Sequence, residues 1–113
     1  MAAPAEPGRA LRLDPRALGL GYRLGSEALL VLLDLAARAV DSPDGTVVVS
    51  SYRDIARRLG VSKDTVGRRI RTLVGAGVVA EHVWVTDDRF EARSYLLNLD
   101  LAGVTLERLP VVA

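Results

Sequence analysis

The chain has 113 residues, half of them hydrophobic, so it can bury the core of one domain without help from disulfides or metal ions. It contains no cysteine, which excludes disulfides and thiolate zinc sites and is compatible with a reducing cytoplasm. Its formal net charge is only +1, and its longest strongly apolar run, residues 28–33, is far too short to span a bilayer.

The beginning of the chain is expected to be irregular. Residues 1–10 are rich in alanine and proline, lack the basic-then-apolar pattern of a signal peptide, and predict a disordered tail. Residues 18–25 contain three glycines, but the third comes one position late for a dinucleotide-binding loop and no strand precedes them, so we interpret them as a flexible connector. The domain itself is expected over residues 11–100. Residues 101–113 would form an extension that could serve dimerisation.

The first helix is predicted over residues 26–40, where Ser26 suits the cap and residues 41–45 supply turn-forming side chains. Its apolar side chains run nearly all the way round: Leu29, Leu30, Val31, Leu32, Leu33 and Leu35. A helix that rests on a small core needs only one apolar stripe. The apolar side chains outside that stripe must therefore be covered by residues 11–24, by residues 101–112 or by a second subunit. Because two-fold dimers are the commonest oligomers, we expect a homodimer.

Residues 51–76 predict two short helices joined by a tight turn. Ser51 suits the cap of the first helix, and Gly60 is well placed for a left-handed turn at its end. The segment holds seven basic and two acidic side chains, so the small net charge of the chain hides a strong local excess. Such clustering predicts a face that binds a polyanion better than net charge does.

The second of these helices is predicted over residues 62–74, with Ser62 as its cap. Val66, Ile70 and Leu73 recur at helical spacing and predict the buried face. At about 100° per residue, the opposite face carries polar and basic side chains, namely Asp64, Thr65, Arg68, Arg71 and Thr72. A basic exposed helix after a tight turn is typical of a helix-turn-helix, whose second helix enters the major groove of DNA.

Residues 54–68 resemble the helix-turn-helix signature of bacterial winged-helix transcription factors of the GntR-like type. The matching positions are Ala56 in the first helix, Gly60 in the turn, and Val61 and Ser62 at the start of the second helix. Arg69 departs from the pattern, because related helices usually carry an apolar residue there. The resemblance implies an α+β winged helix-turn-helix fold, with a three-helix core and a small antiparallel hairpin.

The resemblance also implies which side chains read DNA. The base-reading positions of the family fall on Lys63, Asp64 and Thr65, with Arg68 one turn later. Asp64 could accept from cytosine or stabilise the helix dipole, and Gly67 could let the helix closely approach another surface, such as DNA, or be merely tolerated. With basic side chains of the first helix on the phosphate backbone, the expected DNA-binding residues are Arg53, Arg57, Arg58, Ser62, Lys63, Asp64, Thr65, Gly67, Arg68, Arg71 and Arg89.

The hairpin, or wing, follows directly. Residues 78–85 and 95–99 predict its two strands, residues 86–92 its polar turn, and residues 47–49 a third strand of the same sheet. The turn carries more acidic than basic side chains, so only Arg89 is a candidate for contact with a narrow minor groove.

Catalysis is not expected. His82 is the chain's single histidine and is interpreted as lying on a strand surface, and no nucleophile–base set, metal-ligand spacing or cofactor motif is recognisable. The sequence therefore predicts a DNA-binding protein without enzymatic activity, metal, cofactor or evident small-molecule ligand.

Three roles fit these predictions. The first is sequence-specific binding of double-stranded DNA by a small, dimeric transcriptional regulator, in the bacterial cytoplasm and associated with the nucleoid. The second is a plasmid or phage replication or partition protein that binds repeated sites. The third uses the winged helix as a protein-interaction module, with little salt-dependent affinity for DNA.

Overall fold

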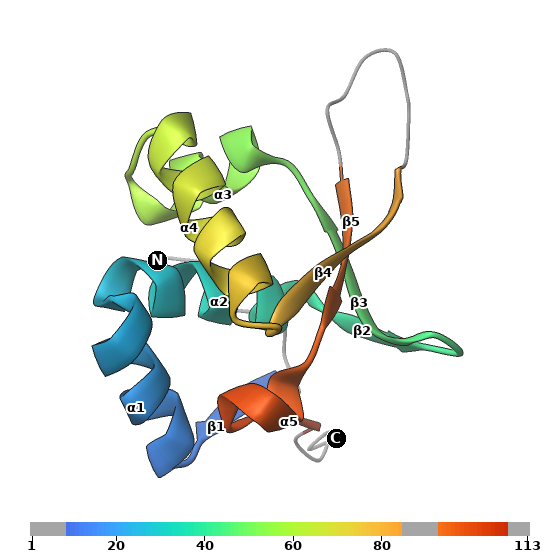
Figure 1. Cartoon of the computed structure of the whole chain (residues 1–113). Helices are drawn as coiled ribbons and strands as arrows, with labels where there is room; N and C mark the ends of the chain where they lie inside the picture. The colour runs from blue at the N-terminus through green and yellow to red at the C-terminus, as the bar shows by residue number, and fades with distance from the viewer. Residues whose placement is uncertain (1–8, 85–92, 109–113) are drawn as a thin grey trace, which may run out of the picture.

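The computed structural model describes residues 9–84 and 93–108. The elements in chain order are β1 (Arg9–Leu13), α1 (Pro15–Leu24), α2 (Ser26–Arg38), β2 (Val40–Ser42), β3 (Gly45–Ser50), α3 (Tyr52–Leu59), α4 (Lys63–Gly75), β4 (Val79–Trp84), β5 (Arg93–Leu97), α5 (Leu99–Ala102) and β6 (Val104–Arg108). Three helices, α2, α3 and α4, lie on one side of an antiparallel sheet, and α1 and α5 lie at one end (Figure 1). No described helix is long and apolar enough to cross a membrane.

The α+β winged-helix prediction is confirmed in its order of elements. The helix, strand, helix, helix, strand, strand series appears as α2, β3, α3, α4, β4 and β5. The four-stranded sheet has the order β2-β3-β5-β4, and Val48 of β3 lies opposite Tyr95 of β5, both buried. The turn of the wing, including the candidate Arg89, lies outside the described residues.

The buried face of α4 also agrees with the sequence pattern. Val66, Ile70 and Leu73 are each at most 1% exposed. They join Leu32 and Leu35 of α2 in one hydrophobic core. Burial of one apolar stripe per helix is the main stabilising contribution in a domain of this size. This packing fixes which face of α4 remains in solvent.

The prediction of a flexible connector at residues 18–25 is wrong. Most of that segment belongs to α1, which Asp14 caps by accepting a hydrogen bond from the backbone N of Arg16 at 2.8 Å. Pro15, at the first helical position, has a φ angle already suited to a helix. A Cβ on Gly21 would lie 2.8 Å from Cδ2 of Leu29, so the glycine lets α1 pack closely on α2. The expected Ser26 cap is also wrong, because Gly25 holds the cap position without a side-chain bond.

The chain itself covers much of α2. Ala28, Val31, Leu32, Leu35 and Ala36 are all at most 1% exposed. Elements α1, β1, α3 and α4 pack around the helix, so part of the cover comes from residues 11–24, one of the three sources considered. Burial of α2 thus no longer requires a second subunit, and the homodimer stays a prediction.

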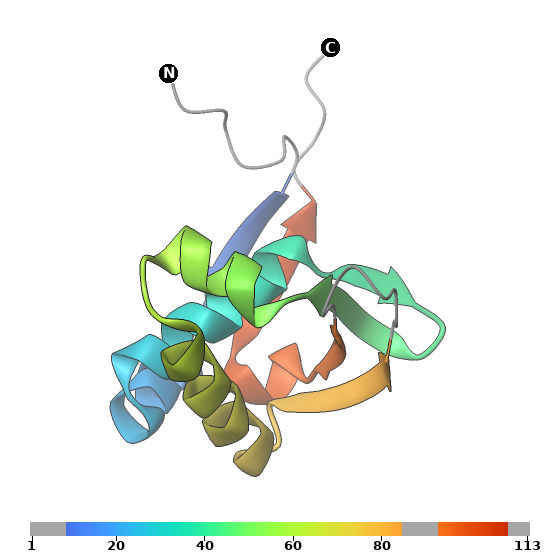
Figure 2. The ribbon, with the colours of Figure 1, turned by 90° about the horizontal axis from the view of Figure 1, so that it is seen from above.

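The two ends of the described chain form a second sheet. β1 pairs with β6 in antiparallel register, from Arg9 opposite Arg108 to Leu13 opposite Val104, and the two strands lie side by side in Figure 2. Residues 9 and 10 therefore belong to a strand rather than to the predicted tail. Leu11 and Leu106 pack against the core, which explains why this ribbon is part of the domain.

Candidate nucleic-acid interface

Two hydroxyl caps and a left-handed glycine build the helix-turn-helix. Ser51 Oγ accepts from the backbone N of Asp54 at 3.1 Å at the start of α3, and Gly60 ends that helix with φ 71°. Ser62 Oγ accepts from the backbone N of Thr65 at 3.1 Å at the start of α4, and also donates to Thr65 Oγ1 at 2.9 Å. These local bonds set the turn and leave the first turn of α4 at the surface.

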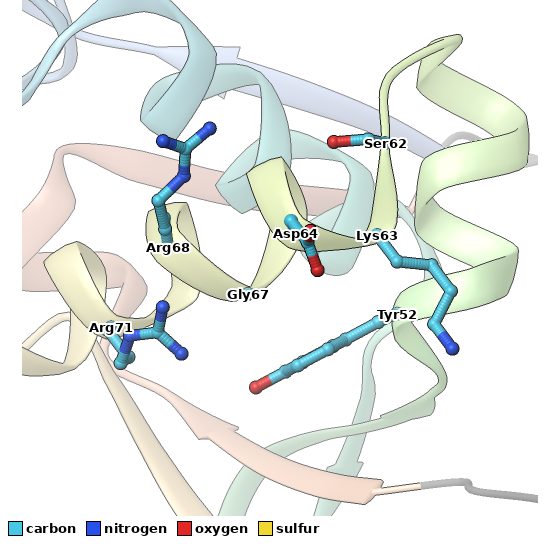
Figure 3. A pocket seen from close by; sticks show the side chains of 7 residues that line it. All are labelled: Tyr52, Ser62, Lys63, Asp64, Gly67, Arg68 and Arg71. Carbon is cyan, nitrogen blue, oxygen red and sulfur yellow. The ribbon is translucent and has the colours of Figure 1, made fainter.

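An open pocket of about 550 Å³ lies along the exposed side of α4 (Figure 3). It is lined by Tyr52, Ser62, Lys63, Asp64, Gly67, Arg68 and Arg71. Six of these seven residues were predicted from the sequence. The structure brings them together because they lie on successive turns of one helix face.

The pocket carries an excess of positive charge. Lys63, Arg68 and Arg71 are exposed, against one exposed carboxylate, Asp64. Asp64 sits in the first turn of α4, where a negative charge also stabilises the helix dipole. Arg68 Nη2 donates to Thr65 Oγ1 at 3.4 Å, which joins the predicted Thr65 to the same surface. The arrangement suits a polyanion with hydrogen-bond acceptors.

Gly67 allows the close approach that one alternative from the sequence anticipated, but the approaching surface is a tyrosine of the same chain. The residue is buried, and a Cβ there would lie 3.2 Å from Cε2 of Tyr52. The missing side chain therefore lets the Tyr52 ring pack against α4. Sequence reasoning missed Tyr52, although a tyrosine next to the Ser51 cap and a glycine inside the second helix were both visible signals.

Tyr52 is also held from the wing. Arg93 Cζ lies 4.7 Å from the centroid of the Tyr52 ring, and Arg93 Nη1 donates to the Tyr52 hydroxyl at 2.9 Å. Glu81 Oε1 lies 3.5 Å from Arg93 Nη1. Behind this group, burial raises the pKa of the Tyr95 hydroxyl well above its ordinary value, and the neighbouring Tyr52 raises it further. Tyr95 is therefore a neutral core side chain and not an acid of the interface.

The basic residues of α3 separate into two groups. Arg53 and Arg57 are exposed, and Arg57 Nη1 lies 3.9 Å from Asp54 Oδ1, a distance typical of a weak surface pair. Arg58 instead points toward α2. Its Nε donates to Asp34 Oδ1 at 2.9 Å and its Nη2 donates to Asp34 Oδ2 at 2.8 Å. Its guanidinium is thus paired with a carboxylate of α2, and its predicted role as a backbone clamp stays a prediction.

We expect Arg58→Ala to lower the free energy of unfolding by about 2 kcal/mol. The side chain of Asp34 is only 9% exposed, and without Arg58 its carboxylate would keep only the longer contact with Arg38 Nε at 3.8 Å among the ion pairs of the described residues. Urea denaturation measures the change, with the neighbouring and exposed Arg57→Ala as the matched control, for which we expect about 0.5 kcal/mol or less. Equal stability of the two variants would contradict the structural role of Arg58.

Arg69, the residue that departs from the family pattern, packs between helices. Its Nη2 donates to Glu27 Oε1 of α2 at 2.9 Å, and its side chain is 32% exposed. Ile70, at 1% exposure, takes the apolar position beside it. The ion pair with Glu27 therefore accommodates a charged residue at position 69, at the edge of the core. The polar face of α4 still lies in solvent.

His82 lies on β4, as expected, in a small polar cluster. Its Nε2 lies 3.2 Å from Asp44 Oδ2, and its Nδ1 lies 3.4 Å from Ser94 Oγ. Ser94 is 6% exposed, so a substrate could not reach its hydroxyl directly. Among the residues that the structure describes, no three His, Cys, Asp or Glu side chains are grouped to hold a metal ion.

Comparison with known protein families matches residues 22–79 to a family described as a helix-turn-helix domain. The match runs from the end of α1 to the start of β4 and includes the whole helix-turn-helix unit. Searches of curated proteins and of solved structures returned no match. Since the matched segment covers about half of the chain and contains the geometry just described, the chain belongs to this helix-turn-helix family, a class of DNA-binding domain.

Proposed function

We propose that the protein binds double-stranded DNA sequence-specifically through α4 and acts as a small transcriptional regulator. The observation that carries the proposal is the open, basic pocket on the solvent face of α4, within a helix-turn-helix. The inner face of α4 is occupied by buried apolar side chains and by the ion pair of Arg69 with Glu27 of α2, so the opposite face is the one available to a ligand.

Each group in this face has a defined part in the proposal. The backbone amides at the Ser62-capped start of α4 bind a phosphate. Lys63, Arg68 and Arg71 contact base edges or phosphates, and an arginine fork suits the two acceptors of guanine in the major groove. Arg53 and Arg57 bind the backbone and set the register of α4. No step requires a metal, a cofactor or catalysis.

The direct test is fluorescence anisotropy of labelled duplex DNA across a salt series, on random sequence and on a duplex selected by the wild-type protein. We expect affinity to fall steeply with salt. Arg68→Ala should weaken the selected site by about 1–3 kcal/mol if Arg68 reads a base. Arg23→Ala, an exposed arginine on α1 outside the helix-turn-helix, is the matched control and should change neither affinity nor salt slope.

The outcomes separate the alternatives. Equal losses for Arg68→Ala on random and selected DNA would make Arg68 a phosphate contact only. Negligible binding at low salt would overturn the proposal in favour of a protein-interaction module. Cooperative loading of many adjacent sites would favour replication or partition of a plasmid or phage genome over regulation of transcription.

We further propose that the protein binds two half-sites as a homodimer. Large apolar side chains remain exposed on the two N-terminal helices: Leu18 at 68%, Tyr22 at 94% and Leu30 at 52%. A two-fold dimer would call for half-sites about 10 base pairs apart or a multiple of that distance. Sedimentation equilibrium at tens of micromolar protein tests the assembly. A monomer at that concentration would overturn the homodimer proposal.

A further inference from the structure

The ring of Tyr52 occupies a fixed place between the helix-turn-helix and the wing. It reaches from the start of α3 beneath α4 toward Arg71, with Gly67 above it (Figure 3). On the α4 side, a Cβ at Gly67 would lie 3.2 Å from Cε2 of the ring, so no bulkier residue fits there without displacement. The position of the ring is therefore set by close packing as well as by its own rotamer.

A second support comes from β5. The Arg93 guanidinium carbon lies 4.7 Å from the ring centroid, a distance typical of a cation–π contact, and Nη1 donates to the hydroxyl at 2.9 Å. Glu81 Oε1, 3.5 Å from the same nitrogen, adds a third group that orients the guanidinium. Contact with α4 at Gly67 and with the guanidinium of Arg93 leaves the ring little freedom, which reduces the entropy lost when a ligand packs against it.

The chemistry around the ring differs from that of a core tyrosine. Tyr52 is only partly buried and lines the same open pocket as Lys63, Arg68 and Arg71. An apolar ring among exposed cations suits a ligand that carries anionic groups beside C–H groups. Duplex DNA offers that combination at a phosphate next to a deoxyribose or to the methyl group of thymine.

We propose that Tyr52 is a DNA-contacting residue whose ring packs against C–H groups of the duplex, and that Arg93 is the positioning residue that holds this ring. The inference rests on the proposed binding of DNA by α4. It extends the interface from α3 and α4 to the base of the wing.

The test compares variants on the selected duplex by anisotropy. Tyr52→Leu keeps apolar bulk against Gly67 but removes the flat ring, and we expect about tenfold weaker binding. Tyr52→Phe keeps the ring and should lose no more than about threefold. Val40→Ala on β2, where the valine is 52% exposed and lies outside both the DNA-binding face and the proposed dimer face, is the control and should bind like the wild type. Circular dichroism melts confirm that each variant is folded at the assay temperature.

The positioning role of Arg93 has its own signature. We expect Arg93→Ala to weaken binding about threefold, with an unchanged salt slope and no further loss in a Tyr52→Leu background. A salt slope lower by about one, with an additional loss in that background, would make Arg93 a direct phosphate contact and overturn its assignment as a positioning residue.

Uracil-containing duplexes distinguish the two sources of C–H contact. If one thymine methyl packs on the ring, replacing that thymine by uracil should remove the penalty of Tyr52→Leu. If Tyr52→Leu still weakens binding whichever thymine is replaced by uracil, the ring contacts deoxyribose. Both results support the inference. Wild-type affinity in Tyr52→Leu, with binding still lost in Arg68→Ala, would overturn the inference alone. Absent binding by the wild-type protein would overturn the proposed function as well.

Discussion

Replacing Ile70 with aspartate is expected to unfold the protein. Ile70 is 1% exposed and lies on the inner face of α4 between Val66 and Leu73. The substitution removes a large aliphatic side chain and places a carboxylate in the hydrophobic core, away from water. We expect a loss of more than about 4 kcal/mol, which is comparable to the whole stability of many single domains.

Val74→Asp is the matched control for this experiment. Val74 lies on the same helix one turn further on, but its side chain is 41% exposed, so the new carboxylate remains hydrated. We expect a change of about 1 kcal/mol, part of it from a negative charge near the helix C-terminus. Urea denaturation followed by circular dichroism measures both variants. A folded Ile70→Asp protein with near wild-type stability would contradict the assignment of the buried face, and with it the exposed face proposed for DNA.

The helix-turn-helix could be predicted because its determinants are local. Ser51, Gly60 and Ser62 are caps and turn residues that act within one or two turns of chain, and the spacing of Val66 and Ile70 is a property of the helix alone. Local sequence patterns also predicted six of the seven residues that line the pocket. Periodicity fixes which side chains share a face even before the partner of the opposite face is known.

The elements missed by the sequence analysis depend on contacts between distant residues. β1 pairs with β6 and joins the two ends of the described chain. The local sequence of one strand does not indicate a pairing partner so distant along the chain. Arg58 looked equivalent to Arg57 because both are exposed by helical spacing, and only Asp34, 24 residues earlier, separates their roles. Tyr52 was overlooked for a related reason, since its position depends on Gly67 and on Arg93 of the wing.

The second large effect concerns the corner between α5 and β6, where Gly103→Ala is expected to lower the free energy of unfolding by about 3 kcal/mol. Gly103 has φ 73°, and a Cβ there would contact Asp14 Oδ1 and lie 2.9 Å from the backbone N of Ala17. Its carbonyl also accepts from the backbone N of Asp14 at 2.9 Å, so the start of α1 cannot move away without losing that bond.

Gly60→Ala separates the cost of backbone conformation from the cost of crowding. Gly60 has nearly the same φ, 71°, and also ends a helix, but a Cβ there would meet nothing within 4 Å. We expect it to lose only the roughly 1 kcal/mol of a left-handed alanine, so the excess loss in Gly103→Ala, read from urea denaturation of both variants, measures the crowding. Equal losses would mean that the corner does not pack on α1. A large excess would show that this corner, which the sequence analysis assigned to a C-terminal extension, packs on α1 as part of the domain.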